Sequence, residues 1–455
     1  MPKLFRPPRL PSILGGRPPA PGEDARAIAR TLLDAVLRRR SALDEALAVH
    51  AGLSLLTPRD RAFARLLVAT VLRRLGQIDA LIDSCVDRPM PDRAAPARDA
   101  IRIGAAQLLF LGTPPHAAVS RAVASLAGRD AAYRGLVNAV LRRISREGAA
   151  RIVGQDAAKI NTPDWLWQSW SSAFGEATCR RIAEQHLAEP PLDLTVKSDP
   201  EIWATKLDAV VMPTGSLRRD AGGAVTELPG FEEGEWWVQD AAAVLPARIL
   251  LSALGGGGGV RIADLCAAPG GKAAQLALAG ARVSAFDIST ARLRQLRVNL
   301  SRLGLDAECT NADARAFAPA EPYPGVLLDA PCASTGTIRR HPDVLRLKSP
   351  DDVARLAHLQ RQMLDAAARA LATGGVLVYA VCSLEPDEGP RQIEDLLARL
   401  PGLARLPVRP DELGPDAAAL APLVTPAGDV QTLPCHFAER GGLDGFYAAR
   451  LVRRD

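Results

Sequence analysis

The sequence predicts an α/β protein in which an open, mostly parallel sheet follows an all-helical domain and a small α+β module. Three observations support this fold class. Residues 260–272 have the pattern of a buried strand, a tight glycine turn and the start of a helix. A second apolar strand then ends in Asp287, as in one half of a doubly wound sheet. The first 147 residues instead repeat apolar side chains at helical spacing.

The N-terminal part of the chain is predicted to be helical after a short arm. Residues 1–22 are rich in proline and arginine and poor in apolar side chains, so we expect a disordered basic arm there. Apolar side chains then recur at helical spacing from residue 24, and again over residues 60–75, 97–111, 116–127 and 131–145. Prolines separate these patterns. Residues 23–147 are therefore predicted to form one all-helical domain.

Positive charge is concentrated in the first third of the chain. Residues 1–150 carry 24 Lys and Arg against 13 Asp and Glu, whereas residues 151–455 carry 32 against 38. The resulting net charge of +11, followed by one of −6, favours a nucleic-acid partner for the helical domain. A solvated basic face without a partner explains the same charge about equally well.

Residues 151–240 are predicted to form a small α+β linking module. Trp165, Trp167 and Trp170 share a helical pattern, and residues 192–196 alternate as in a strand. The tryptophans could stack on bases, but tryptophan at helical spacing more often belongs to a core. Residues 250–259 contain five consecutive glycines and are expected to be a flexible lead within the last domain, residues 241–455.

The glycine turn at Gly270 and Gly271 suits a nucleotide-like ligand. Without a Cβ the backbone can approach a ligand closely, and the first amides of the next helix point outward unpaired. A phosphate-binding Walker loop is excluded, because Cys266 and Ala273 stand where it needs a glycine and a hydroxyl. Asp287 can accept hydrogen bonds from both ribose hydroxyls. NAD and S-adenosylmethionine both fit this pattern.

Strands and helices continue to alternate after Asp287. A helix is predicted at residues 292–303, and strands follow at residues 306–313, 325–329 and 375–381. Ligands of an open parallel sheet bind outside the carboxyl ends of its strands. We therefore expect six functional side chains to converge on that edge: Lys272, Asp287, Asp313, Asp329, Cys332 and Cys382.

Cys332 and Cys382 each come just after a predicted strand, whereas a structural cysteine usually lies within one. We interpret them as a nucleophile and its partner. A thiolate that adds to carbon 6 of cytosine makes carbon 5 reactive enough to attack the methyl group of a sulfonium. A nearby acid must then hold or protonate the pyrimidine edge.

Other classes of site and location are not supported. The seven cysteines lack paired C-x-x-C spacing and the six histidines are scattered, so neither a metal site nor a disulfide framework is predicted. No apolar run approaches the length of a signal segment or a membrane span. We expect a soluble, cytoplasmic protein that acts as a monomer.

Three motifs resemble the Sun/Nop family of RNA 5-methylcytosine methyltransferases. They are DLCAAPGGK at 264–272, DAPCASTGTIRRHP at 329–342 and YAVCSL at 379–384, and the similarity extends through DGFYAAR at 444–450. Residues 113–123 and 133–143 resemble the NusB-type RNA-binding domain, as in the RsmB branch of the family. The resemblance implies a Rossmann-like, S-adenosylmethionine-dependent methyltransferase domain, preceded by a NusB-like domain and a small RRM-like module.

The resemblance also implies roles for individual residues. The cofactor loop would comprise Cys266, Ala267, Ala268, Pro269, Gly270, Gly271 and Lys272. Asp287 would contact the ribose, and Asp313 would lie near the adenine. Asp329 would lie beside cofactor and base, with Cys382 as the nucleophile and Cys332 assisting product release. The departures from the family pattern are Ala273, Ala274 and Val381, where hydroxyl residues are common.

The target, 16S rRNA, follows from the RsmB resemblance alone. The same chemistry on tRNA or on another rRNA site is an alternative. A non-catalytic RNA-binding ribosome assembly factor is another, although intact Asp329, Cys332 and Cys382 argue against it. An NAD-dependent oxidoreductase is the alternative enzyme.

Overall fold

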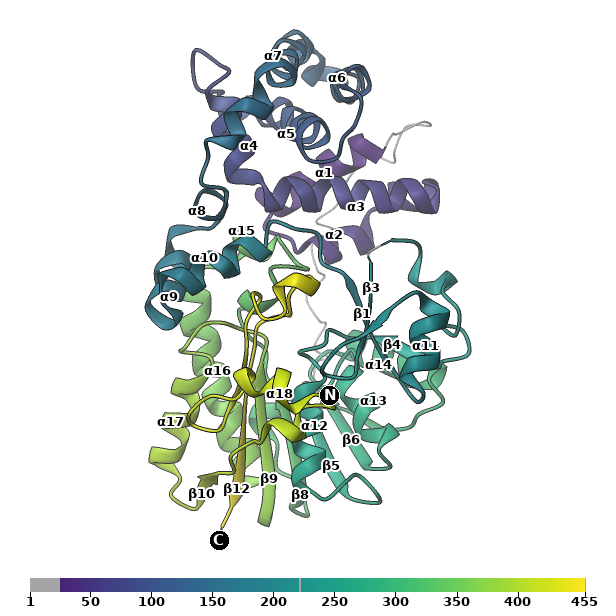
Figure 1. The fold of residues 1–455 in the computed structure, drawn as a ribbon, viewed down its shortest axis with the longest axis vertical. Helices are drawn as coiled ribbons and strands as arrows, with labels where there is room; N and C mark the ends of the chain where they lie inside the picture. The colour runs from purple at the N-terminus through teal and green to yellow at the C-terminus, as the bar shows by residue number, and fades with distance from the viewer. Residues whose placement is uncertain (1–24, 221, 455) are drawn as a thin grey trace, which may run out of the picture. The chain divides into compact units, whose positions relative to one another are not determined.

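The computed structural model describes residues 25–220 and 222–454 (Figure 1). The chain divides into two compact units, one made of residues up to 71 and 80–150, the other of residues 72–79 and those from 151 onward. The basic arm expected at residues 1–22 lies outside the described residues. Among the helices described, none is long and apolar enough to cross a membrane.

The first unit is all helical, as predicted. Its helices are α1 (Ala25–Leu37), α2 (Leu43–Val49), α3 (Pro58–Arg73), α4 (Leu75–Asp83), α5 (Ala95–Leu109), α6 (Pro115–Ala124) and α7 (Arg134–Val153), of which α3, α4 and α7 extend into the second unit. Gly104 lets α5 and α7 pack closely, because a Cβ there would lie 2.6 Å from the Leu141 side chain. Helix α2 was not predicted, since it buries only Leu43 and Ala46, too few residues to set a period.

The second unit begins with three helices: α8 (Ala157–Asn161), α9 (Asp164–Phe174) and α10 (Glu176–Gln185). Trp167 and Trp170 of α9 are buried in a cluster with Ile338, Leu384 and Leu433. The tryptophans are therefore core residues of this unit rather than an exposed stacking surface.

A small antiparallel sheet follows, in the strand order β2-β3-β1-β4. Its strands are β1 (Leu192–Val196), β2 (Val210–Val211), β3 (Leu217–Arg219) and β4 (Trp236–Val238), and α11 (Pro200–Leu207) packs beside them. Arg218 forms a buried ion pair with Asp193 at 2.6 Å and donates to the carbonyl oxygens of Arg440 and Gly442. The hydrogen bonds from Arg218 to these two carbonyl oxygens attach the small sheet to the loop that precedes the last strand of the chain. The predicted α+β module is confirmed.

The large sheet has eight strands, in the order β10-β12-β9-β8-β5-β6-β7, with β11 paired to β12. Neighbours from β9 to β7 are parallel, whereas β12 is antiparallel to β9, β10 and β11. The strands are β5 (Arg261–Leu265), β6 (Arg282–Asp287), β7 (Glu308–Asn311), β8 (Tyr323–Asp329), β9 (Leu371–Val381), β10 (Leu403–Arg405), β11 (Val430–Thr432) and β12 (Phe446–Arg453). The predicted α/β fold is confirmed.

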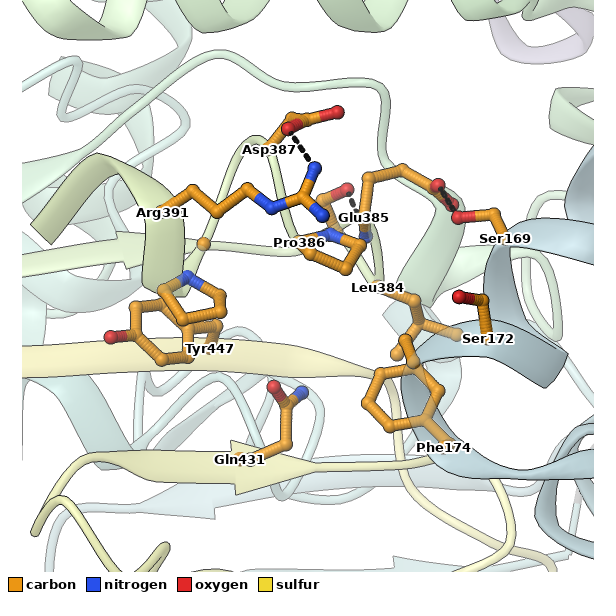
Figure 2. Close-up of a pocket in the computed structure, with 14 residues that line it drawn as sticks. Ser169, Ser172, Phe174, Leu384, Glu385, Pro386, Asp387, Arg391, Gln431 and Tyr447 are labelled. Carbon is orange, nitrogen blue, oxygen red and sulfur yellow. Dashed lines mark hydrogen bonds and ion pairs between the residues drawn. The ribbon is translucent and has the colours of Figure 1, made fainter. Parts of the chain in front are cut away.

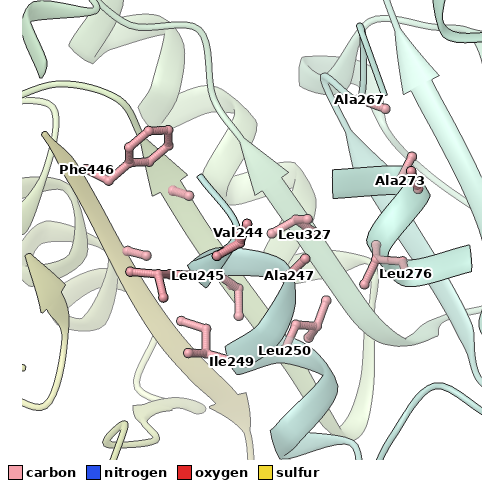
Figure 3. Close-up of a cluster of buried hydrophobic side chains, with 14 of the residues drawn as sticks. Val244, Leu245, Ala247, Ile249, Leu250, Ala267, Ala273, Leu276, Leu327 and Phe446 are labelled. Carbon is pink, nitrogen blue, oxygen red and sulfur yellow. The ribbon is translucent and has the colours of Figure 1, made fainter. Parts of the chain in front are cut away.

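Helices cover both faces of this sheet because its strands alternate their buried side chains. Leu327 of β8 packs with α12 (Leu245–Ala253), α13 (Gly271–Leu278) and α14 (Thr290–Arg302), as Figure 3 shows for α12 and α13. Its neighbours Val326 and Leu328 pack instead with α16 (Pro350–Arg369) and α17 (Pro390–Arg399). The short helices α15 (Val344–Leu347) and α18 (Ala417–Leu420) lie in connections.

Several boundaries differ from those expected. Strand β7 covers only residues 308–311 of the predicted 306–313, and β9 begins at Leu371 rather than at residue 375. The expected flexible lead at 250–259 is wrong in part, because α12 continues to Ala253. Gly257 is also packed so closely that a Cβ there would lie 2.5 Å from the Ala279 carbonyl oxygen.

His186, which follows α10, makes the second unit sensitive to acid. Its ring is buried edge-on against Trp170, and burial, followed by the charges of Arg339 and Arg73, lowers the pKa of His186 to about 3. The unfolded chain binds a proton here below about pH 6.5 and the folded chain does not, so stability is lost as pH falls through this window. Each pH unit within this window lowers the free energy of unfolding by about 1.4 kcal/mol. We expect the free energy of unfolding of His186→Leu, measured by denaturant titration, to fall less steeply between pH 6.5 and 4 than that of the wild-type protein. An unchanged slope contradicts this assignment.

Candidate active site

The candidate site lies where the order of the parallel strands reverses. From β5 the chain proceeds to β6 and β7 on one side and then returns to β8 and β9 on the other. The parallel register pairs Leu265 with Phe286 on one side and with Leu328 on the other. The glycine turn after β5 therefore starts between Asp287 and Asp329, at the position where open α/β sheets bind ligands.

The loop from Cys266 to Lys272 is held in one conformation by its neighbours. Its Ala267 amide donates to the Phe286 carbonyl oxygen at 3.0 Å, and Asn299 of α14 donates to the Pro269 carbonyl oxygen at 2.9 Å. Gly270 has a φ of 108°, and a Cβ there would lie 3.1 Å from Leu296. Only glycine fits this position without strain, so the turn is built for close approach of the backbone.

Asp287 is the last residue of β6, and Asp313 follows the end of the neighbouring strand β7. The buried Asp287 carboxylate accepts from the Ser289 amide at 2.9 Å and from the Ala268 amide at 3.3 Å. The Arg292 guanidinium also lies 3.5 Å from Asp287 Oδ2, so Oδ1 is the oxygen with a second lone pair for a further donor. Asp313 instead accepts from the Arg315 amide at 2.9 Å and pairs with the Arg315 guanidinium, which lowers the pKa of Asp313.

Asp264, near the end of β5 and just before the loop, is fully buried, and neither of its carboxyl oxygens has a hydrogen-bond partner among the described residues. Burial, followed by the negative charge of Asp329, raises the pKa of Asp264 to about 8. At neutral pH the group is therefore mostly protonated, and it can donate as well as accept.

Lys272 and Asp329 connect the glycine turn to the cysteine-bearing loop after β8. Lys272 Nζ lies 2.7 Å from Asp329 Oδ2 and 5.2 Å from the centre of the Phe446 ring. Burial works to lower the pKa of Lys272, but the adjacent Asp329 carboxylate outweighs it, so the pKa is raised. Lys272 consequently remains charged although its side chain is only 10% exposed.

The two cysteines come together from the loops after β8 and β9. Cys332 Sγ lies 3.5 Å from Cys382 Sγ, and Ser334 Oγ lies 3.6 Å from Cys382 Sγ. The hydrogen bond with Cys332 lowers the pKa of Cys382, and Ser334 and Lys272 lower it further against the effect of burial. The same contact, followed by burial, raises the pKa of Cys332. The pair therefore favours a thiolate on Cys382 and a proton on Cys332.

The structure thus brings the expected residues to one sheet edge in two groups. Lys272, Asp329, Cys332 and Cys382 interact with one another, whereas Asp287 is attached to the cofactor loop and Asp313 to Arg315. The expectations did not single out Asp264, Ser334 or the buried Glu388. Asp264 and Ser334 stand within the quoted motifs, but Glu388 lies in a proline- and glycine-containing turn without a recognisable pattern.

These residues fit S-adenosylmethionine. The Gly270 turn has no Cβ, so its backbone is open to close approach by a ligand, and Asp287 retains acceptor capacity for hydroxyl groups. The unpartnered buried Asp264 carboxyl supplies a further polar group next to the same loop.

Comparison with known proteins identifies the family. Residues 253–452 match the family described as 16S rRNA methyltransferase RsmB/F, and residues 23–146 match the NusB family. The chain is 36% identical over 448 residues to the ribosomal RNA small subunit methyltransferase B of Pseudomonas putida, which covers 94% of this chain and 98% of that protein. The corresponding protein of Vibrio cholerae is 34% identical over 450 residues, covering 95% and 98%.

A solved structure agrees with the fold. The crystal structure of PH0851 covers 95% of this chain and 99% of its own, with a TM-score of 0.69 and 20% identity. Because the sequence similarity to methyltransferase B extends along nearly the whole chain, this protein belongs to the RsmB/F family, and it is an S-adenosylmethionine-dependent RNA 5-methylcytosine methyltransferase with a NusB domain.

Proposed function

We propose that this protein methylates carbon 5 of a cytosine in 16S rRNA through a covalent bond between Cys382 and the base. The observation that carries the proposal is the pair of sulfur atoms 3.5 Å apart, beside the Lys272–Asp329 ion pair. The relatives named for small-subunit rRNA support the choice of RNA.

The loop from Cys266 to Lys272, together with Asp287 and Asp313, would hold S-adenosylmethionine. When bound, this cofactor supplies a methyl group bonded to a sulfonium, which an electron-rich carbon can attack. The chain's own contribution is to make carbon 5 of the cytosine electron-rich. The Lys272 and Asp329 side chains connect the cofactor loop to the place where that happens.

Cys382 starts the reaction as a thiolate. Its sulfur adds to carbon 6, a carbon–sulfur bond forms, and the electron pair of the carbon 5–carbon 6 double bond becomes available at carbon 5. Asp329 holds the pyrimidine edge while the charge moves onto the ring. Neither step requires a metal ligand, and the described residues contain no group of side chains suited to a metal.

Release reverses the addition. Carbon 5 loses its proton to a base, those electrons restore the double bond to carbon 6, and the carbon–sulfur bond breaks with its electron pair returning to Cys382. The Cys332 thiol, whose sulfur lies 3.5 Å from that of Cys382 in the free protein, stabilises the departing thiolate. Cys332 therefore acts in the step that frees the RNA.

The first unit is proposed to bind the rRNA. It carries the excess positive charge of the chain, and Arg59, Arg61, Arg142 and Arg146 on α3 and α7 are exposed. Exposed arginines neutralise phosphates and release counterions, which produces affinity that falls with salt.

The identity of the substrate can be tested in cells that lack this gene. We expect one or more 5-methylcytosines in 16S rRNA to disappear on deletion and to return with the wild-type gene but not with Cys382→Ala. Chemical mapping of rRNA and tRNA from the same cells separates the targets. Loss of the modification from tRNA alone contradicts the 16S assignment.

The role of the first unit can be tested by changing Arg59, Arg61, Arg142 and Arg146 together to glutamine. Each phosphate contact that is lost should flatten the plot of log association constant against log salt by about 0.7–0.9. The matched control changes four exposed arginines of α16 and α17, Arg355, Arg361, Arg369 and Arg391, to glutamine. Equal salt slopes for the two quadruple variants, measured on one 16S fragment, would show that the first unit does not dominate binding.

The roles of the two cysteines make opposite predictions. Cys382→Ala should form neither product nor adduct, because the attacking thiolate is gone. Cys332→Ala should accumulate protein bonded to RNA, visible as a denaturant-resistant, nuclease-sensitive band after incubation with rRNA and S-adenosylmethionine. The double variant should resemble Cys382→Ala. A band from Cys382→Ala and none from Cys332→Ala reverses the assignment.

A further inference from the structure

One buried carboxylate joins the two cysteine loops. Glu388 has no exposed surface, and its two oxygens accept from the Ala333 amide at 2.9 and 3.1 Å. The Ser383 hydroxyl donates to Glu388 Oε2 at 2.6 Å, and the Gln360 amide donates to Oε1 at 3.0 Å. All of these hydrogen bonds to Glu388 come from groups of the protein interior.

Two of these donors stand directly after the reactive residues. Ala333 follows Cys332 and Ser383 follows Cys382, so Glu388 holds the backbone amide next to Cys332 and the side-chain hydroxyl next to Cys382. We propose that Glu388 is a positioning residue whose carboxylate fixes the two cysteine loops relative to each other. Both sulfur atoms are then placed to act on the same cytosine. This inference rests on the proposed roles of Cys332 and Cys382.

The negative charge of Glu388 also acts on one of the two cysteines. Burial raises the pKa of Glu388 to about 7, so an appreciable fraction of the group is ionised at neutral pH. That negative charge helps to raise the pKa of Cys332. Glu388 therefore favours a proton on Cys332.

Glu385 is a matched control on the same loop. It is also a buried acid, but its carboxylate accepts from Ser169 at 2.5 Å and from Trp170 at 3.0 Å, both on α9. Figure 2 shows Glu385 directed to Ser169 at the edge of a pocket of about 450 Å³. The same chemical change at residue 385 leaves the contacts of Ala333 and Ser383 with Glu388 in place.

The test compares Glu388→Gln and Glu385→Gln in the full chain. The first substitution places an amide donor where the Ser383 hydroxyl and the Ala333 amide already donate. The first measurement needs no RNA: diamide is added and the rate at which Cys332 and Cys382 form a disulfide is followed by mass spectrometry of the peptides. The second is kcat and KM for the 16S fragment and for S-adenosylmethionine, with melting temperatures recorded for both variants.

We expect Glu388→Gln to slow disulfide formation and to lower kcat by about 10- to 100-fold, as for a misplacement of the reacting groups by about 1 Å, with both KM values kept. Glu385→Gln should form the disulfide and turn over at wild-type rates. Ser383→Ala, which keeps the carboxylate and removes one connection, should shift both rates in the same direction and serves if Glu388→Gln does not fold.

Wild-type disulfide and turnover rates in Glu388→Gln would overturn the inference, and so would equal losses in Glu388→Gln and Glu385→Gln. The disulfide measurement also separates this inference from the proposed function. If the wild-type protein fails to methylate cytosine but Glu388→Gln still slows the disulfide, the proposed function fails and the positioning role stands.

Discussion

The ion pair between Lys272 and Asp329 is the interaction on which the arrangement of the site depends. It joins the glycine turn after β5 to the cysteine loop after β8, across the point where the strand order reverses. Lys272 needs this partner, because its side chain is only 10% exposed and a buried charge is costly unless it is paired. Without Asp329 the buried ammonium would lose its main counter-charge. Without Lys272 the Asp329 carboxylate, which is 30% exposed, would lose its ion-pair partner beside Cys382.

A second constraint is the close crossing of the loops behind the cysteines. A Cβ on Gly336 would lie 1.9 Å from the Gly445 carbonyl oxygen, and the Gly445 amide donates to the Gly336 carbonyl oxygen at 2.8 Å. The buried Arg339 pairs with Asp240 at 2.6 Å and with Asp444 at 3.4 Å. These contacts connect the loop after Cys332 to the end of the small sheet and to the start of β12. The antiparallel strand β12 and the small sheet are thereby part of the support of the site.

Whether a feature of the fold or the site could be predicted depends on how far apart its interacting residues lie in the sequence. The parallel strands and the residues just beyond them were predicted because burial on both faces gives apolar runs that end in polar side chains. The tight packing of the glycine lead around Gly257 depends on Ala279, which no local pattern relates to it. Glu388 could not be found for the same reason, because its partners Ala333 and Gln360 lie 55 and 28 residues away. Motifs therefore brought out the two cysteines but not the buried carboxylate that contacts both of their loops.

Two cysteines in one site can have different roles in a reaction, one in addition and one in release, only if their environments differ. Two thiolates 3.5 Å apart would repel each other, so the pair loses its second proton much less readily than its first, and the surroundings decide which sulfur loses the first. Ser334 and Lys272 favour the charge on Cys382, while burial and Glu388 favour the proton on Cys332. In the proposed mechanism, the sulfur that is left charged attacks, and the sulfur that is left protonated stabilises the thiolate when it leaves. The roles of the two cysteines in that mechanism are then determined by neighbouring groups rather than by any difference between the two side chains themselves.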